Sequence, residues 1–264
     1  MSAADVILDA FASQRLIAPL SDGDQALDEG GAYAIAQEIH QRRIGRGERP
    51  VGRKIGFTNR TIWAEYGVFA PIWGYVYDTT VHFAAEGKAR LALDRLLQPR
   101  IEPEIVLHFT RTPPVTPGEV AILDCIDWIA LGFEIVQCPF PGWTFKPADT
   151  IAAFALHGAL VVGTPVAVQE IEDCSGKLRN FTADLARNNE HQATGGGANV
   201  LDSPLLAFAH LTEVLARQSR FAPVQAGEIV TTGTLTAPQP VAPGETWSSV
   251  LHGINLPGLS MTFA

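Results

Sequence analysis

Two glutamates separated by a single residue lie in a largely apolar segment. Glu102 and Glu104 fall within Ile101–Phe109, where most other residues are hydrophobic. In a β-strand, side chains at i and i+2 project from the same face, about 7 Å apart. Ile101, Ile105, Leu107 and Phe109 would then face a core. Two acids on one face of a buried strand pay for desolvation and repel each other, so they need a positive partner.

A third glutamate poses the same problem alone, because Glu134 is the single charge in Ile129–Val136. A buried, unpaired carboxylate normally takes up a proton. One divalent cation would neutralise all three acids, and ligation by carboxylate oxygens suits Mg²⁺ or Mn²⁺ better than zinc. The residues alone leave simpler interpretations open, namely a solvated strand face for Glu102 and Glu104 and a salt bridge to an arginine for Glu134.

Composition limits the class of protein. The chain has 264 residues, of which 47% are hydrophobic and 18% charged, so it can bury a sizeable core. A net charge of −9 without a cluster of Lys and Arg argues against a nucleic-acid partner. No apolar run reaches the roughly 18 residues of a membrane helix, and the N-terminus lacks the features of a signal peptide. Three scattered cysteines favour reduced thiols and a cytoplasmic location.

The pattern along the chain predicts one compact α+β domain. Residues 1–50 form a helical N-terminal region with apolar residues at helical spacing, and residues 51–264 form a β-rich catalytic domain. Within this domain, a capping box at Thr116 predicts a helix over 117–128, and Ser203-Pro204 starts a helix that ends near residue 219. A shorter helix is expected over 149–157, with Asp149 as its cap and Gly158 as its terminator.

Strands are expected wherever short apolar runs lie between turn residues. Asn188-Asn189 and Pro243-Gly244 have the chemistry of turns between neighbouring strands. The expected strands are Ile101–Phe109, Ile129–Val136, Ala159–Val162, Val166–Glu172, Lys177–Arg187, His191–Thr194, Glu228–Thr231, Thr246–Leu251 and Leu259–Phe263.

Several motifs, in order, resemble those of the 2-keto-4-pentenoate hydratase family, part of the fumarylacetoacetate hydrolase superfamily. The resemblance extends over nearly the whole chain. The motifs are Val51–Thr58 (VGRKIGFT), Gly67-Val68 with Pro71 and Gly74, Leu97–Glu104 (LQPRIEPE), Phe133–Val136 (FEIV), Ala186–Glu190 (ARNNE) and Thr232–Leu235 (TGTL).

The resemblance implies a fumarylacetoacetate hydrolase-like fold, a homo-oligomer and a role in the catabolism of aromatic or related compounds. It implies that Glu102, Glu104 and Glu134 hold Mg²⁺ or Mn²⁺, which chelates the carboxylate and the adjacent oxygen of a small 2-oxo or 2-enol acid. The cation would stabilise dienolate charge while water is added. Lys54 is then a candidate for acid–base catalysis, since apolar neighbours can lower the pKa of a lysine. Asp78 is either a second catalytic residue or a turn residue, and Thr234 is expected to bind substrate.

The segment after Thr150 departs from the family pattern, in which polar Asp, Asn and Ser help to line the pocket. Here the corresponding residues are Ala153, Phe154 and Leu156, so we expect Phe154 and Leu156 to contact the substrate in a more apolar pocket. His157 is either catalytic or the C-terminal residue of a helix. Nearby aromatic residues could admit a larger or more apolar substrate than a five-carbon acid, namely Trp63, Tyr66, Trp73, Tyr75 and Trp143.

The leading hypothesis is therefore a metal-dependent hydratase that converts a 2-hydroxy-alkadienoate into a 4-hydroxy-2-oxo acid. Three alternatives stay open because the polar residues are missing. They are hydrolysis of a carbon–carbon bond in an acylpyruvate, decarboxylation of a 2-oxo-enedioate, and an inactive relative that binds metal and acid without turnover.

Overall fold

The computed structural model describes residues 2–23, 26–60, 63–68 and 70–264, without the side chains of Glu65 and Tyr66. Its helices are α1 (Ala3–Ala12), α2 (Glu29–Gly45), α3 (Trp63–Tyr66), α4 (Glu119–Leu123), α5 (Pro147–Ala152), α6 (Cys174–Asn180) and α7 (Pro204–Arg217). Short 3₁₀ turns are η1 (Leu20–Asp22), η3 (Pro141–Trp143), η4 (Phe154–Leu156), η5 (Val168–Glu170) and η6 (Gly197–Asn199).

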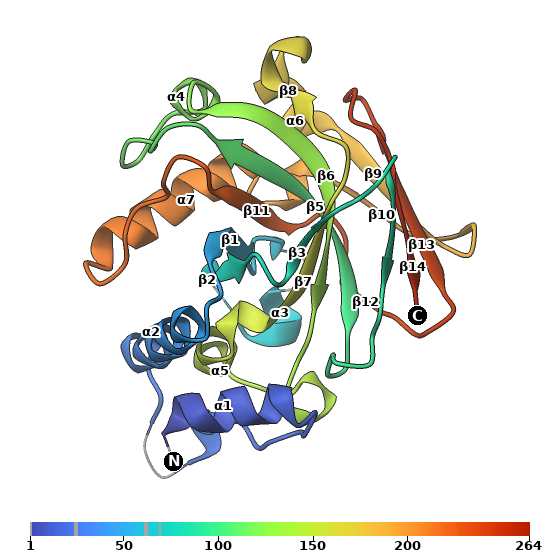
Figure 1. Cartoon of the computed structure of the whole chain (residues 1–264). Coiled ribbons are helices and arrows are strands. Elements are labelled where there is room, and N and C mark those ends of the chain that lie inside the picture. The colour runs from blue at the N-terminus through green and yellow to red at the C-terminus, as the bar shows by residue number, and fades with distance from the viewer. Residues whose placement is uncertain (1, 24–25, 61–62, 69) are drawn as a thin grey trace.

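The strands form two sheets (Figure 1). The larger has the order β2-β1-β11-β5-β6-β7-β3, with β12 on β5 and β8 on β6. Its strands are β1 (Pro50–Gly56), β2 (Ile72–Tyr77), β3 (Val81–Phe83), β5 (Arg100–Phe109), β6 (Ile126–Val136), β7 (His157–Val162), β8 (Val166–Ala167), β11 (Ile229–Thr234) and β12 (Gln239–Pro240). The smaller has the order β10-β9-β13-β14-β4, made by β4 (Lys88–Leu91), β9 (Thr182–Arg187), β10 (Glu190–Gly196), β13 (Thr246–His252) and β14 (Leu259–Phe263).

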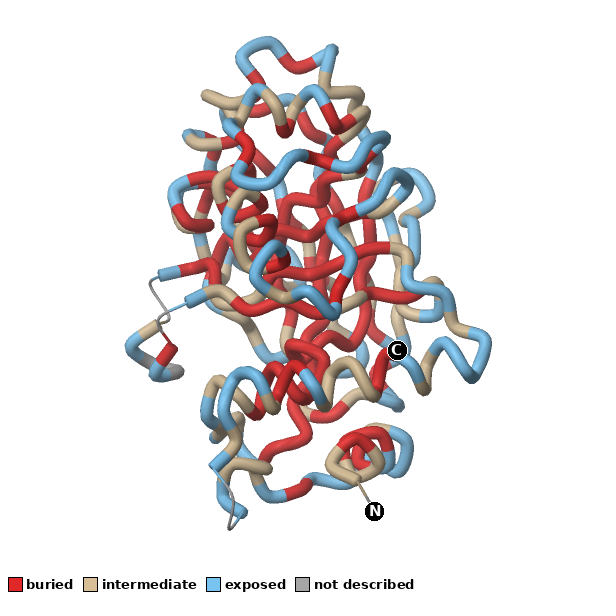
Figure 2. Tube along the Cα trace, turned by 90° about the vertical axis from the view of Figure 1, so that its left-hand side faces the viewer, coloured by how far each residue is buried: buried red, intermediate tan, exposed pale blue. Residues whose placement is uncertain are grey.

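The long antiparallel pair β5 and β6 forms the centre of the larger sheet. Nearly every residue of both strands is buried, and the buried trace runs through the middle of the molecule (Figure 2). The four apolar side chains expected to face a core from β5 are fully buried. The α+β class and the β-rich body expected from the sequence are confirmed.

Two helices form the N-terminal region, as expected. Ser2 and Asp5 form a capping box on α1, and Asp28 accepts a hydrogen bond from Gly31 N at the start of α2. In Figure 1, α1, α2 and α5 gather at one end of the molecule. The boundary near residue 50 is a prediction that this packing does not test. Within the described residues, no helix combines the length and apolar character that crossing a bilayer requires.

Three expected elements differ in extent. The helix expected over 117–128 covers Glu119–Leu123 only, because Gly118 is the cap and Thr116 has a positive φ. The strand expected over 177–187 is strand only from Thr182, since α6 occupies Cys174–Asn180. The strand expected over 166–172 is β8 followed by a 3₁₀ turn. The expected strands also lacked β1, β2, β3, β4 and β12.

The helix expected over 149–157 is wrong in a way that matters for the site. Helix α5 ends at Ala152, and Asp149 lies in its first turn rather than at its cap. The next residues, Phe154, Ala155 and Leu156, all have left-handed φ values of 54°, 54° and 62°. Strand β7 then begins at His157, so this residue belongs to the sheet.

Candidate metal centre and substrate pocket

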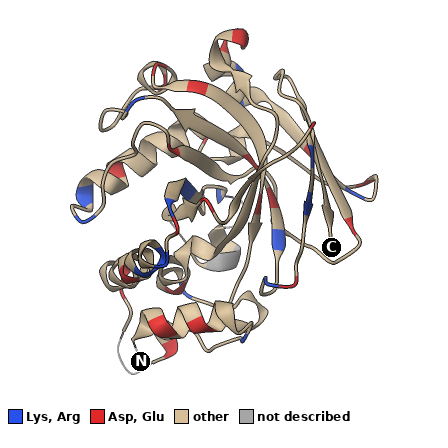
Figure 3. Ribbon diagram, viewed as in Figure 1, with Lys and Arg blue, Asp and Glu red and all other residues tan. Residues whose placement is uncertain are grey.

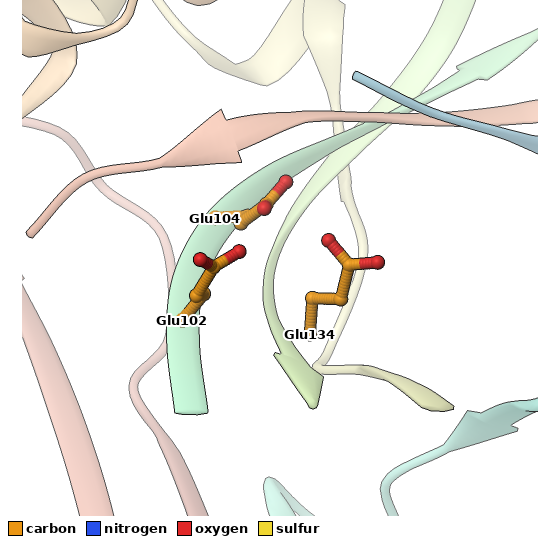
Figure 4. Close-up of side chains that lie close together, drawn as sticks. All are labelled: Glu102, Glu104 and Glu134. Atoms are coloured by element: carbon orange, nitrogen blue, oxygen red, sulfur yellow. The ribbon is translucent and has the colours of Figure 1, made fainter. Parts of the chain in front are cut away.

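The three predicted glutamates converge (Figure 4). Glu102 on β5 lies directly opposite Glu134 on β6, and Glu104 follows on the same face of β5. One carboxylate oxygen from each lies within 4.8 Å of the other two. All three side chains are buried. Like charges placed directly opposite in a sheet destabilise it, so this arrangement calls for a cation.

A bulge in β11 holds Glu104. The pairing of β11 with β5 shifts register between Thr231 and Thr234. There, Glu104 Oε2 accepts hydrogen bonds from the Thr231 hydroxyl and, at 2.7 Å, from Gly233 N. Gly233 has a φ of +106°, and a Cβ at this position would lie 1.7 Å from Thr58 Oγ1, so glycine is required. Glu104 Oε1 is buried and has no hydrogen-bond partner among the described residues.

Glu134 is held from two sides. Its Oε1 lies 2.8 Å from His157 Nδ1, and its Oε2 lies 3.1 Å from Lys54 Nζ without an aligned hydrogen bond. Lys54 Nζ donates instead to the carbonyl oxygen of Ala155, at 2.9 Å. The left-handed turn over Phe154–Leu156 therefore supplies both an acceptor for Lys54 and, directly after it, the imidazole that contacts Glu134.

The three carboxyl groups differ in pKa. Burial raises the pKa of Glu102 to about 7. Burial, together with the charges of Glu134 and Glu102, raises the pKa of Glu104 well above its ordinary value. Burial opposes ionisation of Glu134 as well, but Lys54 and His157 bring its pKa below the ordinary value. Glu134 is thus a fixed anion, whereas the other two bind protons readily when no cation is present.

His157 is neutral in this setting. Burial lowers its pKa, although Glu134 acts in the opposite direction. A neutral imidazole next to an ionised carboxylate carries its proton on Nδ1 and donates it to Glu134. Nε2 is then an acceptor and lies 2.9 Å from the Thr80 hydroxyl. The order Thr80, His157, Glu134 fixes the imidazole and the carboxylate together.

The expected pKa of Lys54 is wrong in direction. Burial alone would lower it, as the apolar neighbours suggested, but the carboxylates of Glu134, Glu102 and Glu104 outweigh burial, and the pKa of Lys54 is raised. The sequence could not show this, because the acids come from strands about 50 and 80 residues further along the chain. Lys54 therefore carries a proton when the site holds no cation.

A pocket opens beside Lys54 and Glu102. Leu156 and Thr234, both expected to contact substrate, lie in its wall. The Thr234 hydroxyl donates to the carbonyl oxygen of Thr236 at 2.7 Å. Trp143 from η3 also lines the pocket, with Phe57 and Phe145 nearby. Glu102 therefore connects the carboxylate cluster to a cavity with a mostly apolar wall.

Two of the expected site residues lie elsewhere. Phe154 does not line this pocket; its ring stacks on Phe11 of α1 with centroids 5.1 Å apart, because the left-handed turn directs it toward the N-terminal helices. Asp78 accepts hydrogen bonds from Arg49 N and Nε at 3.0 and 2.9 Å in the turn after β2. These positions do not support a substrate contact for Phe154 or a catalytic role for Asp78. For Asp78 they favour the alternative, a turn residue.

The expected aromatic residues divide similarly. Of the five, Trp143 lines the pocket, whereas Trp73 and Tyr75, both on β2, pack edge to face with centroids 5.2 Å apart. Trp63 donates to the carbonyl oxygen of Phe57 at 2.8 Å. The side chain of Tyr66 lies outside the described residues.

Sequence reasoning missed Thr231 and Gly233, which hold Glu104, and Thr80, which contacts His157. Thr231 adjoins and Gly233 belongs to the matched motif Thr232–Leu235, in which only Thr234 was given a role, so glycine between polar residues was the available signal. Thr80 and the Ala155 carbonyl gave no signal, because a hydroxyl in a turn and a backbone atom do not indicate a site by themselves.

The residues present fit a divalent cation. The donors are oxygens only, and two buried carboxylate oxygens, Glu104 Oε1 and Glu134 Oε2, accept no hydrogen bond from the described residues. When all three glutamates are ionised, the ammonium group of Lys54 offsets one of their three negative charges. The two that remain equal the charge of one divalent cation. Oxygen-only ligation of this kind suits Mg²⁺, Mn²⁺ or Ca²⁺.

Comparisons with known proteins agree with this arrangement. The family model "fumarylacetoacetate (FAA) hydrolase C-terminal" matches residues 70–256. A 2-keto-4-pentenoate hydratase of Paraburkholderia xenovorans is 32% identical over 96% of this chain and 91% of its own. A 2-hydroxyhexa-2,4-dienoate hydratase of Comamonas testosteroni is 29% identical over 97% of this chain and 95% of its own. A 4-oxalocrotonate decarboxylase of Pseudomonas putida, solved with magnesium and adipate, superposes with a TM-score of 0.88 at 28% identity, covering 99% and 96% of the two chains.

The chain thus belongs to the fumarylacetoacetate hydrolase family, and it superposes on the decarboxylase over nearly its whole length. Within that family it is an enzyme of the 2-keto-4-pentenoate hydratase type, as the order of its motifs indicated.

Proposed function

We propose that this enzyme adds water to a 2-hydroxy-2,4-alkadienoate and releases a 4-hydroxy-2-oxo acid, in the breakdown of aromatic or related compounds. The observation that carries the proposal is the cluster of three buried glutamates, one of which, Glu102, lines a pocket. When all three are ionised, they exceed the charge of Lys54 by two. The hydratases among the relatives support the reaction class.

Glu102, Glu104 and Glu134 would hold a divalent cation, for which we propose Mg²⁺ or Mn²⁺. When bound, this cation supplies a Lewis acid for the carboxylate and 2-oxygen of the substrate. The protein prepares the ligands in advance: Thr231 and Gly233 fix Glu104, while Lys54 and His157 fix Glu134. Ligands fixed in this way need no reorganisation during reaction.

Lys54 is the residue that we propose for proton transfer. Its Nζ lies at the pocket wall, protonated and anchored by Glu134 and Ala155 O. The overall reaction needs a proton on the terminal carbon of the diene, water on the β-carbon of the resulting enone and a proton on the carbon between. A protonated Lys54 can donate the first of these protons while the 2-hydroxyl proton of the dienol leaves to solvent. The neutral amine can then take a proton from the attacking water and pass it to the carbon between the carbonyl and the β-carbon, and it regains its own proton from solvent.

His157 is a positioning residue in this proposal, because it contacts Glu134 through one ring nitrogen and Thr80 through the other, and it does not line the pocket. It fixes the direction of the Glu134 carboxylate, and we assign it no proton transfer to substrate.

The test is turnover of 2-hydroxypenta-2,4-dienoate, whose ultraviolet absorbance is lost on hydration. We expect activity with Mg²⁺ or Mn²⁺, none with chelator, and a loss of at least about a hundredfold in kcat/KM for Glu102→Gln and Glu134→Gln. Glu190→Gln, an exposed change on β10, serves as the matched control. Turnover that persists in Glu134→Gln or in chelator would refute the proposal.

Decarboxylation is the second candidate, because the decarboxylase from Pseudomonas putida superposes closely. Product analysis separates the two reactions, since hydration gives a 4-hydroxy-2-oxo acid without CO₂. Cleavage of an acylpyruvate would give pyruvate and a second acid. An inactive relative would bind Mn²⁺ and leave every substrate unchanged.

We also propose that the protein is a homo-oligomer in the cytoplasm. The family supports the first part, and three buried free cysteines are compatible with a reducing compartment. In the view of Figure 3, basic residues are scattered among acidic ones, which gives no support to a nucleic-acid partner. Light scattering on the purified protein measures the oligomeric state.

A further inference from the structure

The far part of the pocket has an apolar wall. Beyond Lys54, Glu102 and Thr234, the lining side chains are aliphatic or aromatic. Three aromatic rings from two segments meet there: Phe145 lies 6.4 Å from Phe57 and 6.4 Å from Trp143, centroid to centroid. The aliphatic part of the wall comes from Ile72, Val136, Leu156 and Pro238.

The charges of the pocket are confined to one end. Lys54 is the cationic side chain of the described lining, and it already contacts Glu134 and the Ala155 carbonyl. Arg100 lies outside the lining, with its guanidinium 4.2 Å from the centre of the Trp143 ring. The residues outside the described set include neither Lys nor Arg in the sequence.

These two features select among substrates. An apolar chain that extends from the cation toward Trp143 and Phe145 would leave water for an apolar wall, which is favourable. A second carboxylate on the same chain would lose its hydration without finding a cation in that wall, which is costly.

We infer that the substrate is a monocarboxylic 2-hydroxy-dienoate with an apolar extension at its far end, alkyl or aryl, rather than a dicarboxylate. The inference rests on the proposed function, because it places the 2-oxygen and the first carboxylate at the glutamates. It favours hydration over decarboxylation of an enedioate, since the latter substrate carries a second carboxylate.

The experiment measures binding of unreactive, saturated 2-oxo acids by calorimetry on the full chain with saturating Mn²⁺. The probes are 2-oxohexanoate, 2-oxooctanoate and 2-oxoadipate, which share one head group; the first and last also share chain length. We expect affinity to rise about fourfold for each buried methylene. We expect 2-oxoadipate to bind at least about tenfold more weakly than 2-oxohexanoate.

Variants locate the effect. Trp143→Ala and Phe145→Ala, at half-buried positions of the wall, should bring the affinities for 2-oxooctanoate and 2-oxohexanoate close together. Phe83→Ala is the matched control, because Phe83 is 60% exposed on β3 and should leave the ratio unchanged. Affinities independent of chain length would overturn the inference. So would tight binding of 2-oxoadipate, including binding that depends on Arg100.

A negative result in the binding series can be distinguished from a negative result in the turnover assay. A flat series beside intact hydration of 2-hydroxypenta-2,4-dienoate overturns the inference and leaves the proposed function in place. A rising series without hydration refutes the proposed reaction and supports the apolar substrate class.

Discussion

At the scale of single residues, the site depends on how Glu134 is held. The imidazole of His157 lies 2.8 Å from Glu134 Oε1, and the ammonium group of Lys54 lies 3.1 Å from Glu134 Oε2. Neither partner follows from local sequence, because Lys54 comes from β1 and His157 from the strand after a left-handed turn. A fixed carboxylate direction is what a cation with strict geometry requires.

Replacing His157 tests this role. We expect His157→Ala to weaken Mn²⁺ binding, measured by electron paramagnetic resonance, about tenfold or more, because Glu134 loses the donor that orients it. His157→Asn keeps a donor amide near Nδ1 and should recover part of the affinity. His82→Ala, an exposed change on β3, is the control. Unchanged Mn²⁺ affinity in His157→Ala would contradict a positioning role.

At the scale of elements, the left-handed turn over Phe154–Leu156 connects the two anchors of Glu134. Three successive non-glycine residues with positive φ are strained, and surrounding contacts must hold them. Gly74 on β2 is one such contact: a Cβ there would lie 2.7 Å from the Phe154 carbonyl oxygen. Glycine at this position therefore lets β2 approach the turn.

The change Gly74→Ala should displace that turn. We expect it to lower the free energy of unfolding by about 1–3 kcal/mol, from the forced contact with backbone. Mn²⁺ affinity should fall as well, because the turn carries both the Ala155 carbonyl and His157. Gly45→Ala at the end of α2 meets nothing within 4 Å and should leave both quantities nearly unchanged. Thermal unfolding and Mn²⁺ titration check both, and a fully stable Gly74→Ala would contradict this account.

The two types of element differed in how well sequence predicted them. Long apolar strands such as β5 and β6 were predicted because alternation and burial are local properties. The helix expected over 149–157 failed because its end is set by contacts with β1 and β2, which come from distant sequence. The three glutamates could be named from the sequence because a charge in an apolar strand is a local signal. Thr231, Gly233 and Thr80 could not be assigned a role, because their roles depend on contacts with distant sequence.

At the scale of the whole molecule, the buried acids link stability to pH and to metal. In the folded protein without metal, burial raises the pKa of Glu102 to about 7 and that of Glu104 well above its ordinary value of 4.5. At pH values between the ordinary pKa of a glutamate and these raised values, the folded state binds more protons than the unfolded state. These two groups therefore make the free energy of unfolding fall as pH rises through that range. His40 acts in the opposite direction, because burial lowers its pKa to about 4.

Metal should therefore stabilise the protein more at pH 7.5 than at pH 5.5. With Mn²⁺ at about one hundred times its Kd, we expect the Tm at pH 7.5 to rise by about 5–10 °C. The rise should be smaller at pH 5.5, where protons compete for the carboxylates. Glu102→Gln should reduce the difference between the two pH values. Differential scanning calorimetry measures this, and an equal metal effect at both pH values would contradict the assignment.

The most direct test of the three-glutamate site is anomalous diffraction from crystals grown with Mn²⁺. The account predicts one peak bounded by oxygens of Glu102, Glu104 and Glu134, at about 2.0–2.3 Å from each, typical of a hard cation on carboxylates. A Mn²⁺ peak elsewhere, with these three carboxylates still paired only to Lys54, His157, Thr231 and Gly233, would contradict it.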